Sequence, residues 1–140
     1  MKHKGFTVIE FLGVLAAILV LSATVIPVGS QILNYGRYNA AASGAAAIST
    51  AISQYTFEME EYPQNLDVLT KSAGEGQFGP WITEEALIDP WGQDYQFAIT
   101  DGRVAVWSCG PDQANQTGGS APEDDFPGDD IGVVVTIINF

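Results

Sequence analysis

The chain has 140 residues and a formal net charge of −12, from 5 basic and 17 acidic side chains. This length holds one domain and one long appended element, because single domains typically span roughly 100 to 150 residues. Binding to nucleic acid needs clustered cations, and two of the few basic residues, Lys2 and Lys4, lie at the very start of the chain. Nucleic acid is therefore not expected as the primary partner.

The sequence also lacks the usual means of catalysis and of covalent cross-linking. It holds one histidine, His3, and one cysteine, Cys109, whereas general-base and nucleophilic catalysis rely heavily on these residue types. A single cysteine cannot form an intrachain disulfide. We therefore predict that the protein is not an enzyme, and that a hard cation held by the plentiful carboxylates could replace a disulfide as a staple.

Residues 6–28 form an almost wholly apolar stretch, broken only by Glu10 and a few small residues. About 20 such residues suffice to cross the core of a bilayer as a helix, so the stretch predicts a transmembrane segment. The basic residues Lys2 and Lys4 stand directly before it. By the positive-inside tendency they place the amino terminus in the cytoplasm and the rest of the chain outside.

A second helical pattern follows over residues 29–60, where apolar positions recur at spacings of three and four, as is typical of an amphipathic helix. These positions are Ala41, Ala45, Ile48, Ile52, Tyr55 and Met59. Pro27 lies just before this half of the helix, and its missing N–H is expected to loosen the helix locally. That slack could serve extraction from the membrane, or the proline could simply mark the membrane boundary.

Residues 61–140 read as a small globular region. Asn65 is expected to cap a short helix over residues 66–72. Strands are predicted over residues 95–99 and 103–108, joined through Asp101-Gly102, a dipeptide that favours tight hairpin turns. An acidic loop over 109–130 precedes a run rich in β-branched residues, 131–138. We therefore predict an α+β fold, in which one long amino-terminal helix packs on a small antiparallel sheet.

A basic leader of five residues ends at Gly5, and Phe6, Glu10 and the apolar run follow it. This segment, KGFTVIE at residues 4–10, resembles the prepilin leader of type IV pilin-like proteins. The resemblance implies that a membrane-embedded prepilin peptidase removes residues 1–5 by cutting after Gly5. It also implies that the same enzyme methylates the new amino terminus at Phe6.

Glu10 needs a physical reason, because a carboxylate near one end of an apolar span costs about a few kcal/mol unless a partner compensates it. The resemblance implies that this partner is the amine of Phe6 in a neighbouring subunit, and that the pair fixes the register of helices in a filament. Two other interpretations stay open. Glu10 could reach the lipid headgroups, or the segment could be an ordinary secretory signal peptide, although a glutamate within it counts against that.

The globular region carries a second group of motifs, the turn Asp89-Pro90-Trp91-Gly92 and the segment SCGPD at residues 108–112. Both are similar to the major pseudopilin of type II secretion systems. That family carries a short sheet packed on the carboxy-terminal half of the long helix. It also carries a calcium ion in the loop before its last strand.

Carried over position by position, the calcium ligands that the resemblance implies are Asp112, Asp129 and Asp130. Ser108 is a possible further oxygen donor, and backbone carbonyls would complete the six to eight oxygens that calcium takes. The chain departs from the family at Gln113, where glycine is usual, and its loop is longer. The additional acids of the loop are alternative ligands: Glu123, Asp124 and Asp125. The loop could also be only a solvated acidic surface.

The resemblance implies a structural subunit of a type II secretion pseudopilus. Such a subunit is held in the bacterial inner membrane by a single span, with its carboxy-terminal domain in the periplasm, and then stacks with identical subunits into a helical filament for protein export. The implied partners are minor pseudopilins, the prepilin peptidase and the inner-membrane assembly platform.

Three alternatives remain open. One is a surface type IV pilin used for adhesion, motility or DNA uptake. Another is a membrane-tethered calcium-binding domain that does not polymerise. The weakest is an enzyme with a catalytic carboxylate pair at Glu60-Glu61 or Glu84-Glu85, since these residues are expected on solvated helix or turn positions.

Overall fold

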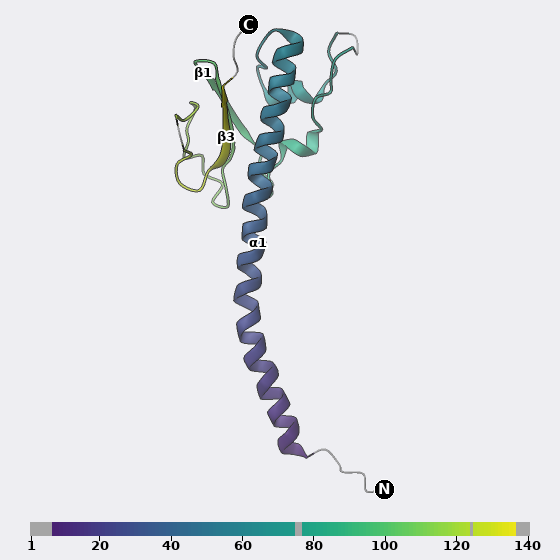
Figure 1. Ribbon diagram of the computed structural model, residues 1–140, viewed down its shortest axis with the longest axis vertical. Helices are drawn as coiled ribbons and strands as arrows, with labels where there is room; N and C mark the ends of the chain where they lie inside the picture. The colour runs from purple at the N-terminus through teal and green to yellow at the C-terminus, as the bar shows by residue number, and fades with distance from the viewer. Residues whose placement is uncertain (1–6, 75–76, 124, 137–140) are drawn as a thin grey trace. The chain divides into compact units, whose positions relative to one another are not determined.

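The computed structural model of the protein describes residues 7–74, 77–123 and 125–136, without the side chains of residues 24–31. Its elements follow the order α1 (Val8–Met59), η1 (Leu66–Thr70), η3 (Glu84–Leu87), β1 (Gln96–Thr100), β2 (Arg103–Ser108) and β3 (Ile131–Thr136), as drawn in Figure 1. The chain divides into two compact units, Met1–Gly36 and Arg37–Phe140, and each is described by itself.

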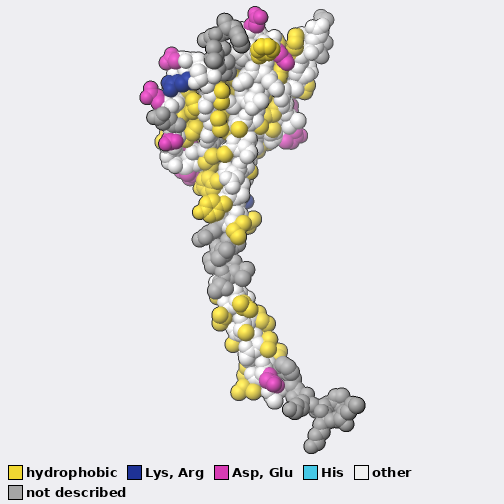
Figure 2. Space-filling model, viewed as in Figure 1, with side chains coloured by type: hydrophobic (Ala, Val, Ile, Leu, Met, Phe, Trp, Pro, Cys, Tyr) yellow, Lys and Arg dark blue, Asp and Glu magenta, His cyan; other side chains and the backbone are white. Residues whose placement is uncertain are grey.

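The first unit consists of the early part of α1, and its large apolar side chains are exposed. From Val8 to Leu21 they are between 41% and 78% exposed, and Figure 2 shows them along the helix surface. Within the described residues, no helix has the length and apolar character needed to span a membrane. The transmembrane segment predicted over 6–28 is therefore not confirmed, and residue 6 and the side chains of residues 24–28 lie outside the described part.

The helix continues through Pro27 and Gly29 without a break in its assignment and ends at Met59. The predicted end near residue 60 is thus confirmed. The local loosening expected at Pro27 stays a prediction, because its side chain is outside the description. A proline inside a helix removes one backbone hydrogen bond, but the neighbouring residues on both sides remain helical here.

In the second unit, the face of α1 that was predicted to be apolar forms one side of the core. Ala45, Ile48 and Ile52 are fully buried, and they share a cluster with Val104 and Val106 of the central strand. Figure 1 shows the sheet alongside this part of the helix. Burying a large aliphatic side chain stabilises a fold by about 1.5–3 kcal/mol, so this face holds the helix on the sheet.

The sheet has three antiparallel strands in the order β1-β2-β3. Thr100 pairs with Arg103 at the end of the first hairpin, and the two residues between them have positive φ, 51° at Asp101 and 74° at Gly102. Those angles belong to the tight turn that the dipeptide predicted. The predicted hairpin is therefore confirmed, with β1 beginning one residue later than expected.

Side chains of β2 alternate between two clusters, as a strand with period two requires. Val104 and Val106 face the helix, whereas Ala105 and Trp107 pack with Ala98 and Ala121 in a second cluster on the other side. β3 pairs with β2 from Ile131 opposite Ser108. The closing strand predicted over 131–138 is confirmed to Thr136, and residues beyond it lie outside the description.

Two short 3₁₀ helices cover the remaining edge of the core. Asn65 caps η1 as predicted, since its side-chain oxygen accepts a hydrogen bond from the N–H of Val68 at 3.1 Å. η1 ends at Thr70 rather than at residue 72. η3 was not predicted; it brings Leu87 into the core as a single short turn, which carries too few residues for a helical period to be visible in the sequence.

Candidate functional site

The start of α1 is a capping box formed by Thr7 and Glu10. Glu10 Oε2 accepts hydrogen bonds from the N–H of Thr7 at 2.8 Å and from its hydroxyl at 2.9 Å, and the N–H of Glu10 donates to Thr7 Oγ1 at 3.4 Å. This reciprocal pair satisfies backbone donors that a helix start leaves open. The Thr-x-x-Glu spacing before an apolar run is a known signature of such a cap, and the sequence reasoning missed it.

The predicted processing residues Gly5 and Phe6 lie outside the described part of the chain. Glu10 is exposed within its own chain, so its carboxylate is accessible to another molecule while one of its oxygens caps the helix. Pro27 belongs to α1, but its side chain is outside the description. The structure therefore shows a local role for Glu10 and leaves its pairing with a neighbouring Phe6 untested.

The second predicted region is organised by the turn at Asp89, which is 5% exposed. Asp89 Oδ1 accepts hydrogen bonds from the backbone N–H groups of Trp91 at 2.9 Å and Gln93 at 2.8 Å. The backbone closes the same turn, because the Asp89 N–H donates to the Gln93 carbonyl at 2.7 Å. One buried side chain thus fixes the whole Asp-Pro-Trp-Gly turn.

Ser108 connects this turn to the acidic loop. The hydroxyl of Ser108, which is fully buried, donates to Asp89 Oδ2 at 2.5 Å and accepts from the N–H of Gly110 at 3.1 Å. Ser108 was predicted as a possible calcium ligand. The structure instead places its hydroxyl between Asp89 and the first residues of the loop.

The two ends of the acidic loop meet at Gly110 and Asp129. Gly110 has φ +67°, and a side chain there would collide with the carbonyl and carboxylate of Asp129. The N–H of Asp112 donates to Asp129 Oδ2 at 3.3 Å, and Asp112 itself accepts hydrogen bonds from Ala114 N–H and Gln116 Nε2, both at 2.7 Å. Two of the predicted ligands are thus brought together at the loop closure.

Asp130, the third predicted ligand, is buried beside them. Its Oδ2 accepts hydrogen bonds from the N–H and the hydroxyl of Thr117, both at 2.6 Å. Its Oδ1 is buried and has no hydrogen-bond partner among the described residues. A buried carboxylate oxygen left without a donor is costly, and a cation is one group that would satisfy it.

Cys109 is the first residue of the acidic loop and is buried, as expected for a small core residue. Burial raises the pKa of its thiol, and the carboxylates of Asp130, Asp89, Asp112 and Asp129 raise it further, in that order. The charges of these four carboxylates therefore all disfavour the thiolate form of Cys109. The loop base is a region of concentrated negative charge.

The alternative ligands predicted in the loop are Glu123, Asp124 and Asp125. Glu123 and Asp125 are exposed, and Asp124 lies outside the described residues. Across the described part of the chain, no three acidic, histidine or cysteine side chains stand close enough to hold a metal ion by themselves. A calcium ion at the loop base would therefore need backbone carbonyl oxygens among its ligands, which is usual for calcium.

The far end of the loop is anchored on the sheet. Trp107 Nε1 donates to Asn115 Oδ1 at 3.3 Å, and the ring of Phe126 lies on Trp107 with centroids 6.1 Å apart. Gly132 makes room for this contact, because a side chain there would meet the Phe126 ring. The sequence predicted a calcium-binding acidic loop here, but it did not predict this anchoring on the sheet.

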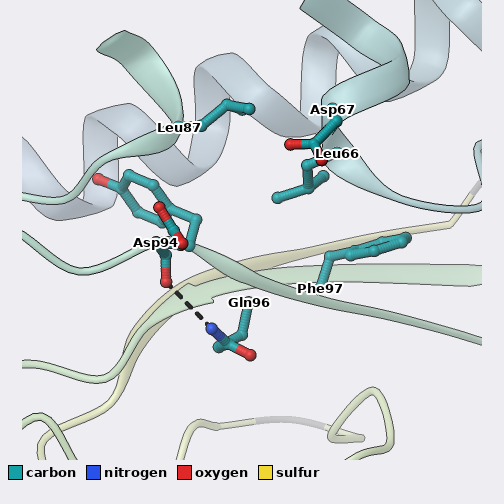
Figure 3. Close-up of a pocket in the computed structure, with 7 residues that line it drawn as sticks. Leu66, Asp67, Leu87, Asp94, Gln96 and Phe97 are labelled. Carbon is teal, nitrogen blue, oxygen red and sulfur yellow. Dashed lines mark hydrogen bonds between the residues drawn. The ribbon is translucent and has the colours of Figure 1, made fainter. Parts of the chain in front are cut away.

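A separate groove lies between η1, η3 and the start of β1. It has a cavity of about 320 Å³ lined by Leu66, Asp67, Leu87, Asp94, Tyr95, Gln96 and Phe97, and Figure 3 shows it. An adjoining cavity shares Asp67, Leu87 and Asp94 and includes Glu84. The other acids considered for catalysis, Glu60, Glu61 and Glu85, are exposed and do not line either cavity.

A long amino-terminal helix whose later part packs on a small antiparallel sheet, with an acidic loop closing onto the last strand, defines the class of pilin-like subunits. The family model described as "Type II secretion system (T2SS), protein G" matches residues 30–126. The chain belongs to this family, the major pseudopilins of type II secretion systems. The family assignment that the sequence motifs suggested is therefore confirmed.

Curated relatives agree with this assignment. The type II secretion system core protein G of Pseudomonas aeruginosa is 30% identical over 135 residues, which cover 89% of this chain and 94% of that protein. The proteins of the same name in Klebsiella pneumoniae and Escherichia coli are each 28% identical over 121 residues, covering 79% of this chain and 86% and 83% of theirs. No solved structure matches the chain.

Proposed function

We propose that the protein works as a structural subunit that builds a pseudopilus by packing its amino-terminal helix against the same helix in other copies. The observation that carries this is the exposed apolar surface from Val8 to Leu21. An exposed apolar surface of this extent marks contact with a membrane or with another protein. Membership of the pseudopilin family favours both contacts, one after the other. Lipid would cover the surface before assembly, and neighbouring helices would cover it afterwards.

The same surface supports a location in the inner membrane before assembly. The subunit would stand there with its amino terminus in the cytoplasm and its second unit in the periplasm, held by residues 6–28. Prepilin peptidase would cut after Gly5 and methylate Phe6. The partners would be identical subunits, minor pseudopilins and the inner-membrane assembly platform, and the chemistry would come from the peptidase and an assembly ATPase rather than from this chain.

Glu10 is proposed to pair with the amine of Phe6 in a neighbouring copy. Within its own chain Glu10 is exposed, and both hydrogen bonds from Thr7 go to the same oxygen, Oε2. The carboxylate could therefore cap its own helix and meet a positive charge from outside at the same time. In an apolar filament interior such a charge pair is favourable, because an unpaired carboxylate there is costly.

The test is to express the chain with a type II secretion assembly machine, image the filaments and determine the amino terminus of the polymer by mass spectrometry. We expect filaments whose subunits start at a methylated Phe6. Glu10→Ala should abolish filaments, whereas Glu85→Ala, which removes an exposed acid outside the acidic loop, should leave them intact. Filaments from Glu10→Ala, or residues 1–5 retained in the polymer, would contradict the proposal.

Calcium is proposed to bind at the base of the acidic loop. The support is the contact of Asp112 with Asp129 at the closure of the loop, together with the buried Oδ1 of the adjoining Asp130, which has no donor among the described residues. A bound calcium ion would supply charge neutralisation and would tie the two ends of the loop together. Asp112, Asp129 and Asp130 are the residues that would hold it, with backbone carbonyls as the remaining ligands.

A further inference from the structure

The hydrogen bond between Asp89 and Ser108 is a buried polar contact of the second unit. Ser108 is 0% exposed and Asp89 is 5% exposed, and their oxygens are 2.5 Å apart across 19 positions of sequence. Asp89 is held rigidly by its own turn, through Trp91 and Gln93. Its second oxygen is therefore a fixed acceptor pointing at the end of β2.

Ser108 passes this constraint on to the loop. Its proton is donated to Asp89, and its oxygen accepts from the N–H of Gly110. Gly110 sits in the left-handed region at φ +67° with Asp129 packed directly against it. The position of Asp129, and of the Asp112 N–H that donates to it, therefore follows from where Gly110 is held.

We propose that Asp89 and Ser108 are positioning residues for the calcium-binding loop, and that Ser108 acts through Gly110 rather than as a ligand. The proposal rests on the calcium site proposed above. Groups that orient the ligands of a metal ion without touching it commonly contribute about 10–100-fold to its affinity. Asp89 and Ser108 would act in this way, because they hold the backbone of Gly110 in place without contacting the ion themselves.

The test measures calcium binding to the full chain in detergent micelles by isothermal titration calorimetry. We expect Ser108→Ala to raise the Kd for calcium by about 10–100-fold. Ser53→Ala is the matched control, because it removes a partly buried hydroxyl that donates to a helix carbonyl at Ser49. That control should leave the calcium Kd within twofold of wild type.

A double-mutant cycle separates positioning from general destabilisation. Asp89→Asn keeps an oxygen for the Trp91 and Gln93 amides but replaces the oxygen that accepts from Ser108. If both residues act through one bond, their effects on the calcium Kd are coupled and do not add. The Kd of the double variant should then be no higher than that of whichever single variant binds calcium less tightly. Additive losses, or a Ser108→Ala Kd equal to that of wild type, would overturn the proposal.

Hydrogen exchange of the wild-type chain without calcium provides a readout that needs no variant. The Gly110 amide should be protected by its bond to Ser108 at 3.1 Å, at least tenfold more than the amide of exposed Gly119. Exchange as fast as at Gly119 would overturn the positioning role. A wild-type chain that binds no calcium but protects Gly110 would instead overturn the calcium site, and with it this role.

Discussion

Single residues determine the local structure at two places that matter for the proposed function, the start of α1 and the base of the acidic loop. At the amino-terminal end, the carboxylate of Glu10 satisfies a helix start, so its retention in an apolar stretch has a local reason as well as a reason in assembly. At the loop base, Gly110 gives Asp129 the space to close the loop. In both places a small change of chemistry would act directly on a predicted functional group.

Gly110→Ala should open the loop base. The added methyl would collide with Asp129, and the left-handed conformation costs a residue with a side chain roughly 1–2 kcal/mol more than glycine. We expect a lower melting temperature in thermal denaturation and a weaker response to calcium.

Gly118→Ala is the matched control for that change. Gly118 has a comparable φ of +79°, but nothing lies within 4 Å of the added methyl. The conformational cost is shared by both variants, so the difference in melting temperature isolates the collision with Asp129. Equal melting temperatures would mean that Asp129 does not close on Gly110.

At the scale of elements, the packing of α1 against the sheet depends on a glycine in the helix, Gly44, whose missing side chain leaves room for Tyr95. The hydroxyl of Tyr95 donates to the carbonyl of Ala41 at 3.0 Å in a buried position. Gly44 permits this, because a side chain there would collide with the Tyr95 hydroxyl. The contact joins segments 54 positions apart in sequence, so it fixes the helix against the residue that directly precedes β1.

Gly44→Ala should therefore destabilise the second unit although alanine is the better helix former. Helix propensity alone would stabilise the variant by about 0.5–1 kcal/mol, and the collision with Tyr95 must exceed that gain. Gly36→Ala is the control, since it lies in α1 with nothing within 4 Å of the new methyl. Chemical denaturation should give a lower free energy of unfolding for Gly44→Ala only. If both variants were stabilised, Gly44 would not be needed to accommodate the Tyr95 hydroxyl.

Tyr95 also predicts how stability depends on alkaline pH. Burial and then the nearby charge of Asp89 raise the pKa of Tyr95 to about 12. Because the folded pKa is above that of an unfolded tyrosine, near 10, the stabilisation is complete below pH ~10 and is lost as pH rises towards ~12. The stability difference between wild type and Tyr95→Phe should shrink across that range in urea titrations, and a constant difference would contradict the shifted pKa.

Taken as a whole, the second unit combines an excess of acidic residues with a loop base where the buried Asp130 Oδ1 has no donor among the described residues, so the proposed calcium site predicts that its stability depends on that ion. At a calcium concentration about 100 times its Kd, binding to the folded state alone contributes about 2.7 kcal/mol. Adding a chelator to the calcium-loaded full chain in detergent should therefore lower its melting temperature by several degrees. Asp130→Asn should remove most of that response, and a chelator without effect on wild type would remove the calcium proposal.

Much of this architecture was predictable, because it is encoded locally. The spacing of Ala45, Ile48 and Ile52 predicted the buried helix face, and Asp101-Gly102 predicted the hairpin, since only a few residues accept positive φ. The bond between Asp89 and Ser108 was not predictable in this way. Neither residue carries a local signal for the other, and only the folded sheet brings them together.

The placement of the acidic loop between β2 and β3 has a consequence for how the protein is made. The central strand β2 receives its second neighbour only from residues 131–136, after the entire loop has been synthesised. Contacts between segments so far apart form slowly. A nascent chain leaving the ribosome therefore exposes an unpaired edge of β2 until residues 131–136 arrive, and an unpaired strand edge of this kind is prone to aggregation.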